Sequence, residues 1–184
     1  GINYCTGDII GILNSDDIYA NKNIISNIIQ QIELFKADSA YGDLIYTKAD
    51  DLNHIIRYWK SSDFNKKKFL LGWMPPHPTF FVKREIYIKH GLFNLKLKSA
   101  ADYEIMLRFL YKKNISTIYL NEILTKMRVG GKSNNSLTSR LEGNREDRLA
   151  WKLNGLRSSH ITFIFKPLRK IPQFFIRPKS RNNE

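Results

Sequence analysis

Cysteine is nearly missing from this chain of 184 residues, which contains Cys5 alone. One cysteine excludes an intramolecular disulfide framework and a zinc site built on Cys-x-x-Cys, so we expect a reducing compartment. Long apolar runs are missing as well. Charge-free stretches such as residues 9–15 and 161–165 fall far short of the ~20 residues that a bilayer-spanning helix needs. We therefore predict no transmembrane helix and expect a cytoplasmic location.

The motifs of several enzyme classes are also missing. The sequence contains no HExxH, GxSxG, GxxxxGK[ST] or GxGxxG. Their absence argues against zincins, nucleophile-elbow serine hydrolases, P-loop proteins and dinucleotide-binding enzymes at the level of motifs. The chain begins with Gly-Ile-Asn-Tyr and shows no methionine, basic region and apolar region of a signal peptide, so its start is expected to be a cut end.

Acidic residues are scarce relative to basic ones. There are 17 Asp and Glu against 30 Lys and Arg, which gives a formal net charge of +13. Residues 140–184 hold 11 of the basic and 4 of the acidic residues, and thus more than half of the excess. This segment is a candidate surface for an anionic partner such as phosphate or phospholipid. We expect no nucleic acid, because no RNP-like, helix-turn-helix or zinc-finger pattern accompanies the charge.

Strand and helix patterns alternate along the first third of the chain. Residues 8–14 predict a buried strand that stops at Ser15-Asp16-Asp17, and Asn21 is expected to cap the helix that follows. Residues 39–47 and 55–59 predict two strands that form a hairpin. The apolar face expected for the first helix comprises Ile24, Ile25, Ile28, Ile29 and Ile32.

The rest of the chain continues this alternation. Pro75-Pro76-His77-Pro78 predicts irregular backbone, because prolines fix φ and remove amide donors. Beyond it the patterns predict a strand at 79–82, a helix at 84–90 closed by Gly91, a helix from Ser99 with Asp102 in its first turn, strands at 115–120 and 124–129, and a polar helix at 136–156. Alternating strands and helices are typical of an α/β fold.

Asp16 and Asp17 are the sharpest local candidate for chemistry. They directly follow a predicted strand, and open α/β sheets bind ligands at the carboxyl ends of their strands. Carboxylate oxygens at such a place suit Mg²⁺ or Mn²⁺ bridging to a diphosphate. The alternative is structural: one Asp caps the next helix while the other is solvated.

Asp102 and His77 are further candidates. A carboxylate in the first turn of a helix can act as a general base toward a hydroxyl within hydrogen-bond reach. The free amides and the dipole of the helix explain the same placement without a catalytic role. Glu104 is the weaker base candidate, since it points to another helix face. His77, in its proline-locked loop, could face a substrate or metal, or be a structural histidine.

A glycine pair follows the last predicted strand. Gly130-Gly131-Lys132-Ser133 could wrap a phosphate with backbone amides. A plain turn after the strand explains the same residues.

Four blocks of the sequence, in this order, resemble family 2 glycosyltransferases of the GT-A fold. They are TGDIIGILNSDD (6–17), PHPTFFVKR (76–84), AADYE (100–104) and VGGKS (129–133). A lone Asp-Asp pair is unspecific, whereas four ordered blocks at family-like spacing are a much stronger signal. The resemblance covers residues 1–140.

The resemblance implies a GT-A-like mixed sheet flanked by helices and an inverting, metal-dependent sugar transfer. By position, it implies that Asp17 coordinates Mn²⁺ or Mg²⁺, that Asp16 contacts the donor, and that Asp102 deprotonates the acceptor hydroxyl. The acceptor or phosphate side would contain His77, Gly130, Gly131 and Ser133. The implied donor is a UDP- or GDP-sugar, and the implied acceptor is a saccharide or a lipid-linked saccharide of the cell envelope.

One departure from the family pattern raises a second hypothesis. Family members begin with a strand and helix unit that holds the nucleotide base, and it precedes the block that opens this chain. Residues 1–139 would then be a partial GT-A domain, either of an enzyme or of a non-catalytic remnant or partner subunit that needs another chain for its nucleotide site. Missing strands would leave an open sheet edge, which predicts self-association or a partner chain.

Residues 140–184 form the second predicted unit, a basic helical and aromatic tail. Between Trp151 and Arg177, aromatic and aliphatic residues are interleaved with Lys and Arg. Such a segment can lie in the interface of an anionic membrane, attached peripherally to its cytoplasmic face. It can equally pack on the sheet while its cations reach water.

Overall fold

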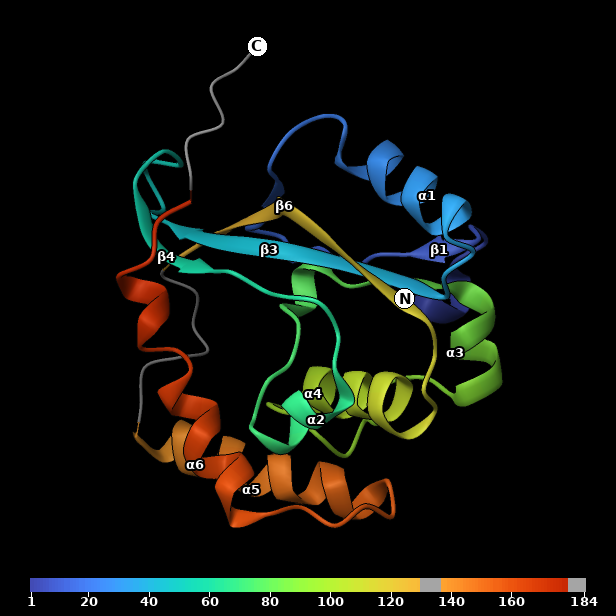
Figure 1. Cartoon of the computed structure of the whole chain (residues 1–184), viewed down its shortest axis with the longest axis vertical. Helices are drawn as coiled ribbons and strands as arrows, with labels where there is room; N and C mark the ends of the chain where they lie inside the picture. The colour runs from blue at the N-terminus through green and yellow to red at the C-terminus, as the bar shows by residue number, and fades with distance from the viewer. Residues whose placement is uncertain (130–136, 179–184) are drawn as a thin grey trace.

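The computed structural model describes residues 1–129 and 137–178 as a mixed sheet flanked by helices (Figure 1). In chain order the elements are η1 (Ile2–Tyr4), β1 (Ile9–Ile10), β2 (Ile18–Tyr19), α1 (Ile24–Leu34), β3 (Ser39–Thr47), β4 (Ile55–Trp59), α2 (Lys66–Leu70), η2 (His77–Thr79), β5 (Phe81–Lys83), α3 (Arg84–His90), α4 (Ala101–Met106), η3 (Leu107–Lys112), β6 (Thr117–Arg128), α5 (Leu137–Leu153), α6 (His160–Leu168) and η4 (Pro172–Phe174). The predicted α/β class is confirmed.

The sheet is built around β3. Its strand order is β1-β5-β3-β6-β2, and β4 also pairs with β3. The β3–β6 pair is parallel and runs from Ser39 opposite Thr117 to Thr47 opposite Arg128, whereas the other pairs are antiparallel. Near Gly42 the register of this pair shifts, and a Cβ on Gly42 would come within 2.5 Å of Leu124. Glycine therefore permits the close approach of the two strands.

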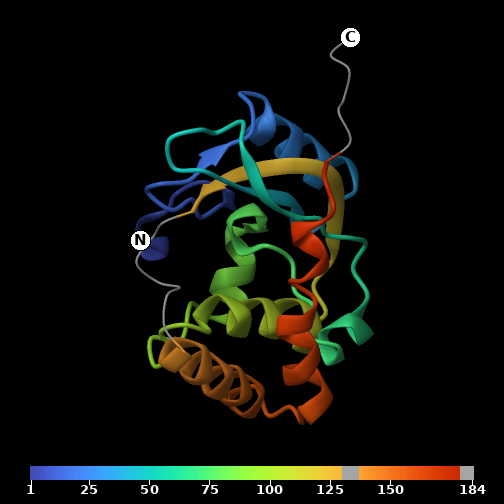
Figure 2. The same ribbon diagram turned by 90° about the vertical axis from the view of Figure 1, so that its left-hand side faces the viewer.

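Two apolar clusters cover the two faces of the sheet. On one face, α1 packs its buried residues Ile24, Ile28 and Ile32 against the sheet, including Leu124 of β6. On the other face lies a larger cluster that includes residues of α4, η3, α5 and α6 (Figures 1 and 2). Its fully buried Trp151 belongs to α5. The carboxyl-terminal helices thus contribute to the main core.

The structure confirms the predicted boundaries of some elements and corrects others, such as the strand expected at 79–82, which is β5 at Phe81–Lys83. The predicted ranges of β3, β4 and α3 are confirmed, and Gly91 ends α3 with φ of 89°. The strand expected at 8–14 shortens to Ile9–Ile10. The two strands expected at 115–120 and 124–129 are one strand, β6.

The first helix starts later than predicted. Ile24 is its first residue, with Asn23 at the N-cap, while the side chain of Asn21 accepts a hydrogen bond from the amide of Asn23 at 2.8 Å. Ile25 and Ile29 were expected on the apolar face, but both are partly exposed. The helix buries only Ile24, Ile28 and Ile32, so the face that contacts the sheet includes three of the five isoleucines.

Candidate functional site

Asp102 lies in the first turn of α4, as predicted, and faces His77. Its Oδ2 lies 3.4 Å from Nδ1 of His77, and its side chain is half-exposed. The imidazole packs edge-on against the ring of Phe93, with 5.9 Å between ring centroids. Burial lowers the pKa of His77, while the charge of Asp102 opposes this effect. The structure thus brings together two residues that the sequence separates by a strand and a helix.

The loop that carries His77 is tied to the sheet by two threonines. The buried hydroxyl of Thr79 lies 3.0 Å from the carbonyl oxygen of Gly42 in β3. Thr125 of β6 donates a hydrogen bond to the carbonyl of Pro78 at 3.0 Å. Within this loop, residues His77–Thr79 form a 3₁₀ turn. These anchors fix the position of the imidazole relative to the sheet.

The N-terminus of α4 is held by Glu146 of α5. The carboxylate of Glu146 accepts hydrogen bonds from the amides of Lys98, Ser99 and Ala100, the last two at 2.7 and 2.9 Å. Burial tends to raise the pKa of Glu146, but these amide donors outweigh it and the pKa is lowered. The segment that leads into Asp102 is therefore fixed by a second helix.

Glu104 has a structural environment. It is 3% exposed, pairs with Arg108 at 3.0 Å and accepts a hydrogen bond at 3.0 Å from Asn154, the residue that follows α5. Arg108 also donates to the carbonyls of His90 and Leu92. Glu104 is thus buried and bonded within the fold, which agrees with the preference for Asp102 as the base candidate.

Asp102 borders a cavity of about 410 Å³ whose walls come from distant parts of the chain. Tyr46 and Arg57 line it from β3 and β4, and Lys166 and Arg169 line it from the carboxyl-terminal segment. The cavity therefore combines a half-exposed carboxylate with several cationic side chains. Such a composition suits an anionic or polyhydroxyl ligand.

Arg57 lines this cavity and is surrounded by aromatic rings. Its guanidinium lies 3.9 Å from the centroid of the Tyr46 ring, with the Trp59 and Phe174 rings at 5.6 and 5.7 Å. Burial lowers the pKa of Arg57, and Tyr46 opposes this. Its Nε atom is buried without a hydrogen-bond partner. The contacts with the three rings stabilise the positive charge of this guanidinium.

Asp17 lies in the turn after β1 and is 4% exposed. Its Oδ2 accepts a hydrogen bond from the side chain of Asn14 at 2.8 Å, whereas its Oδ1 is buried and has no hydrogen-bond partner among the described residues. Burial raises the pKa of Asp17 despite the hydrogen bond from Asn14, and the neighbouring charge of Asp16 adds to the rise. Asp16 itself is exposed, and its carbonyl accepts a hydrogen bond from Arg128 at 3.3 Å.

The Oδ1 atom of Asp17, which has no hydrogen-bond partner among the described residues, could bind a cation. The described residues supply few further ligands for such a cation. No group of three or more His, Cys, Asp or Glu that could hold a metal ion occurs in residues 1–129 and 137–178. A Mg²⁺ or Mn²⁺ ion that takes one or two carboxylates and completes its shell with phosphate and water is compatible with this arrangement.

The two carboxylate candidates occupy neighbouring parts of the structure. Asp16, Asp17 and His77 do not line the cavity that Asp102 borders. Tyr46 connects the two regions, because it lines that cavity and interacts electrostatically with Asp17. Burial and the charge of Asp17 raise the pKa of the Tyr46 hydroxyl, whereas the charge of Arg57 lowers it. Gly130, Gly131, Lys132 and Ser133 lie outside the described residues.

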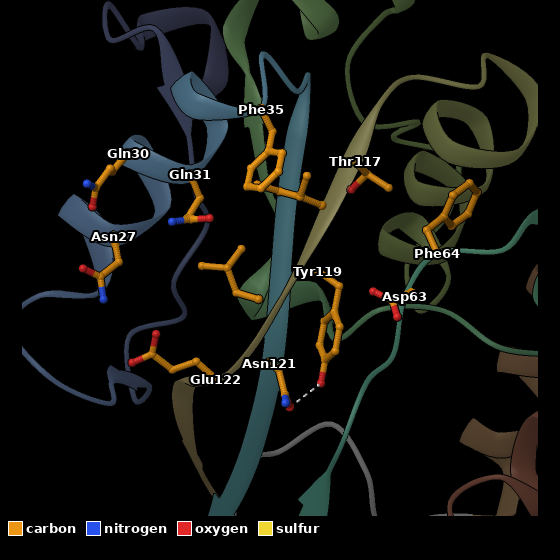
Figure 3. Close-up of a pocket in the computed structure, with 12 residues that line it drawn as sticks. Asn27, Gln30, Gln31, Phe35, Asp63, Phe64, Thr117, Tyr119, Asn121 and Glu122 are labelled. Carbon is orange, nitrogen blue, oxygen red and sulfur yellow. Dashed lines mark hydrogen bonds between the residues drawn. The ribbon is translucent and has the colours of Figure 1, made fainter. Parts of the chain in front are cut away.

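A second, shallower cavity of about 770 Å³ lies between α1, the first half of β6 and residues 63–64 (Figure 3). Asn27, Gln30 and Gln31 face it from α1, and Tyr119 and Asn121 from β6, 3.2 Å apart through their side-chain oxygens. No Lys or Arg is among the residues that line it. No pattern in the sequence predicted this cavity.

Buried Asp43 joins the two cavities. It accepts hydrogen bonds from Tyr119 at 2.8 Å, from the amide of Ser61 at 2.7 Å and from Tyr58. Tyr58 lines the cavity beside Asp102, and Tyr119 lines the second one. Burial and the bond to Asp43 raise the pKa of Tyr58.

The comparisons with known proteins show the fold. A scan against models of protein families gives no match, and neither does a search of curated proteins. Solved structures of the glycosyltransferase TarS from S. aureus do match. TarS 1-349 has a TM-score of 0.56 at 14% identity over 93% of this chain and 49% of its own. TarS 1-349 in complex with UDP-GlcNAc has a TM-score of 0.57 at 12% identity over 89% and 47%.

A further TarS structure matches with a TM-score of 0.54 at 16% identity, over 87% of this chain and 27% of its own. The fold is GT-A-like. This chain spans about half of the length of TarS 1-349. At such low identity the likeness concerns the architecture, so the roles of individual residues rest on the geometry described above.

The residues that sequence reasoning missed are the cations around Asp102. Arg57 was part of a predicted strand, and Lys166 and Arg169 were part of a tail considered as a surface for anions. The excess of Lys and Arg in residues 140–184 was the feature of the sequence that pointed to these cations. The contact of that tail with the surroundings of Asp102 depends on how the helices pack, which composition does not encode.

Proposed function

We propose that this chain carries the metal-binding and acceptor-binding residues of a glycosyltransferase. The enzyme would transfer a sugar from a UDP- or GDP-sugar to a saccharide or lipid-linked acceptor, with inversion, in surface polysaccharide or glycolipid assembly. The observation that carries the proposal is the placement of Asp102 in a GT-A-like fold. It is half-exposed, faces His77 and borders a cavity with cationic walls.

In this proposal Asp102 is the general base. Its carboxylate accepts the proton of the acceptor hydroxyl, and the acceptor oxygen forms a bond to the anomeric carbon while the bond from that carbon to the diphosphate breaks. One displacement inverts the configuration at this carbon. His77, whose pKa is lowered mainly by burial, is neutral near pH 7 and can donate from Nδ1 to hold the Asp102 carboxylate in place.

The leaving diphosphate needs positive charge. Asp17, through its buried Oδ1, and the exposed Asp16 are the residues that would hold a divalent cation, and the cation would supply positive charge to the diphosphate. Arg57 and Arg169 supply fixed positive charge in the cavity beside Asp102. The fit of TarS in complex with UDP-GlcNAc to this fold supports a nucleotide-sugar donor.

Calorimetric titration tests the donor part of the proposal. The folded chain is titrated with UDP, and separately with GDP, in the presence of Mn²⁺. We expect metal-dependent binding that Asp17→Asn abolishes and that Asp50→Asn, an exposed carboxylate in the turn after β3, leaves unchanged. Absence of binding by the folded wild-type chain would contradict the proposal. It would favour the alternative of a partner subunit whose nucleotide site needs another chain.

Turnover tests the role of Asp102. Release of the nucleoside diphosphate from a donor that binds can be followed with water as the acceptor. We expect Asp102→Asn to lower this rate about 100- to 10,000-fold, as for loss of a general base, without weakening donor binding. Asp50→Asn again serves as the control. Turnover of Asp102→Asn near that of the wild type would exclude Asp102 as the base.

A further inference from the structure

Helix α6 turns polar side chains toward the protein. Thr162 donates a hydrogen bond to the carbonyl of Leu70 at 2.7 Å, and Lys166 pairs with Asp147 at 2.6 Å. One turn further, Nε of Arg169 donates to the carbonyl of Leu71 at 2.8 Å. Their spacing of four and three residues places all three on one face of the helix.

The opposite face of the same segment is apolar and faces solvent. We call it the outer stripe; it consists of Ile161, Ile164, Phe165, Leu168, Ile171 and Phe175. These side chains are between 45% and 80% exposed. The segment runs along one outer side of the molecule (Figures 1 and 2). A helix on the surface of a soluble domain normally has the reverse arrangement, with its apolar stripe inward.

The charged residues of the segment that carries the outer stripe have a single sign. From Arg148 to Pro178 the sequence contains no Asp or Glu. Lys152, Arg157, Lys170 and Arg177 are exposed in this part of the chain. An exposed apolar stripe bordered by cations is typical of helices that lie in the interface of an anionic membrane.

We propose that the outer stripe docks on the surface of an anionic lipid bilayer. The apolar side chains enter the boundary between headgroups and acyl chains, and the cations contact anionic headgroups. The segment would lie in the plane of the interface. Among residues 1–129 and 137–178 no helix is long and apolar enough to cross a membrane.

A second copy of the chain is a less suitable occupant. In a two-fold symmetric dimer the same patch faces itself. The cations that border the outer stripe would then meet one another, with no acidic residue from Arg148 to Pro178 to compensate them. A bilayer with anionic headgroups supplies the missing negative charge.

Docking would bring the cavity beside Asp102 close to the membrane. Arg169 and Gln173, on the inner side of the segment, line that cavity together with Asp102. An acceptor held in the bilayer by a lipid could then reach Asp102 from the headgroup region. This consequence rests on the proposed function, whereas the docking itself does not.

Vesicle flotation tests the docking with the whole chain and without nucleotide. One set of vesicles contains phosphatidylglycerol and phosphatidylcholine in equal parts, and the other contains phosphatidylcholine alone. We expect the chain to float with the anionic vesicles and to be released as salt screens the headgroups. Replacing Arg157 and Arg177 by Gln should weaken this partitioning about 25-fold, or about fivefold per cation. The Lys112→Gln, Lys113→Gln control should not.

The apolar contribution is tested separately. Ile164→Gln with Leu168→Gln should lower partitioning at least tenfold, because both side chains would lose their burial in the interface. The control is Ile88→Gln with Leu95→Gln, which replaces two strongly exposed apolar residues elsewhere. All four positions are exposed, so the variants are expected to fold, which circular dichroism would verify.

Three results would overturn the docking. The first is a folded wild-type chain that stays with the buffer in the presence of anionic vesicles. The second is equal flotation of the Ile164→Gln, Leu168→Gln variant and its control. The third is a concentration-dependent dimer, seen by light scattering, that this variant abolishes, which would assign the stripe to a second copy. None of these readouts depends on donor binding or sugar transfer.

Discussion

At the scale of single residues, the partners of the buried carboxylates distinguish structural from functional candidates. Among the described residues these carboxylates are Asp17, Asp43, Glu104 and Asp147. Asp43 accepts three hydrogen bonds, Glu104 pairs with Arg108, and Asp147 pairs with Lys166. Asp17 has the side chain of Asn14 as its hydrogen-bond donor, and one of its oxygens is left without a partner. A buried carboxylate oxygen without a hydrogen-bond partner lowers the stability of the fold, and such a group is typical of a ligand-binding position.

Asp17→Asn should therefore make the ligand-free chain more stable at neutral pH. Because the folded state raises the pKa of Asp17, the carboxyl favours folding in acid and loses this contribution as the pH rises through the folded pKa. Asparagine does not titrate, so the variant should gain on the order of 1 kcal/mol at pH 7 and less at pH 4.

Urea unfolding at the two pH values measures this difference. Asp16→Asn is the matched control, since Asp16 is exposed and its replacement should have a smaller effect. A variant that is less stable than the wild type at pH 7 would show that Asp17 supports the fold through its charge.

The sequence was informative about residue types and silent about their contacts. Helical periodicity correctly placed Asp102 in a first turn and separated it from Glu104. It did not predict that His77 would lie 3.4 Å from Asp102, because that contact depends on the anchoring of the proline loop to β3 and β6. The aromatic surroundings of Arg57 likewise require Phe174, more than 100 residues later.

At the scale of secondary structure elements, α4 depends on α5. The amides of Lys98, Ser99 and Ala100, which lead into α4, donate hydrogen bonds to the carboxylate of Glu146. Negative charge at this end of a helix is also favoured by the helix dipole. Because Asp102 lies two residues further on, Glu146 positions it without touching the cavity.

Glu146→Gln should destabilise the chain by about 1 kcal/mol at pH 7, since glutamine keeps one acceptor and loses the charge. The folded state lowers the pKa of Glu146, so its contribution is present above the unfolded pKa and disappears as the pH falls through the folded one. The loss should thus vanish in acid.

Urea unfolding at pH 7 and pH 3 tests this expectation, with hydrogen exchange at residues 98–100 as a local readout. Glu142→Gln on the same helix is the control, because Glu142 is exposed. Equal destabilisation at both pH values would mean that packing, and not charge, explains the effect.

The predicted ranges were correct for β3, β4 and α3 and wrong for β1, β5 and β6. The ranges of β3 and β4 were predicted correctly because each has a paired neighbour along its length. The strand expected at 8–14 is short because β1 ends the sheet order and its partner β5 has three residues. Asn121 and Glu122 interrupt the apolar pattern of β6, but pairing with β3 continues past them through a register shift.

At the scale of the whole molecule, the carboxyl-terminal helices share the core with the sheet. Trp151 is 1% exposed, and its Nε1 donates a hydrogen bond to the hydroxyl of Tyr103 at 2.9 Å. Phe163 belongs to the same apolar cluster. We therefore expect one cooperative unfolding transition for the two predicted units, residues 1–139 and 140–184.

Trp151→Ala should lower the free energy of unfolding by about 3–5 kcal/mol, because it leaves a cavity in the main core. Leu153→Ala, on an exposed part of the same helix, should cost far less. Differential scanning calorimetry follows both variants and the wild type. Two separate transitions in the wild type, with the substitution shifting one of them alone, would show that the carboxyl-terminal helices fold as an independent unit.

The parallel pairing at the centre of the sheet also determines how the chain folds. Ser39 pairs with Thr117, and β4, α2, β5, α3 and α4 all lie between these two residues in the sequence. Closing so large a loop costs entropy before the pairing returns any free energy, which makes such topologies slow to fold. During synthesis the hairpin of β3 and β4 can form early, but the other edge of β3 stays open until Arg128 has been made. In that interval this edge is the part of the chain most exposed to wrong partners, and a chaperone would be expected to act there.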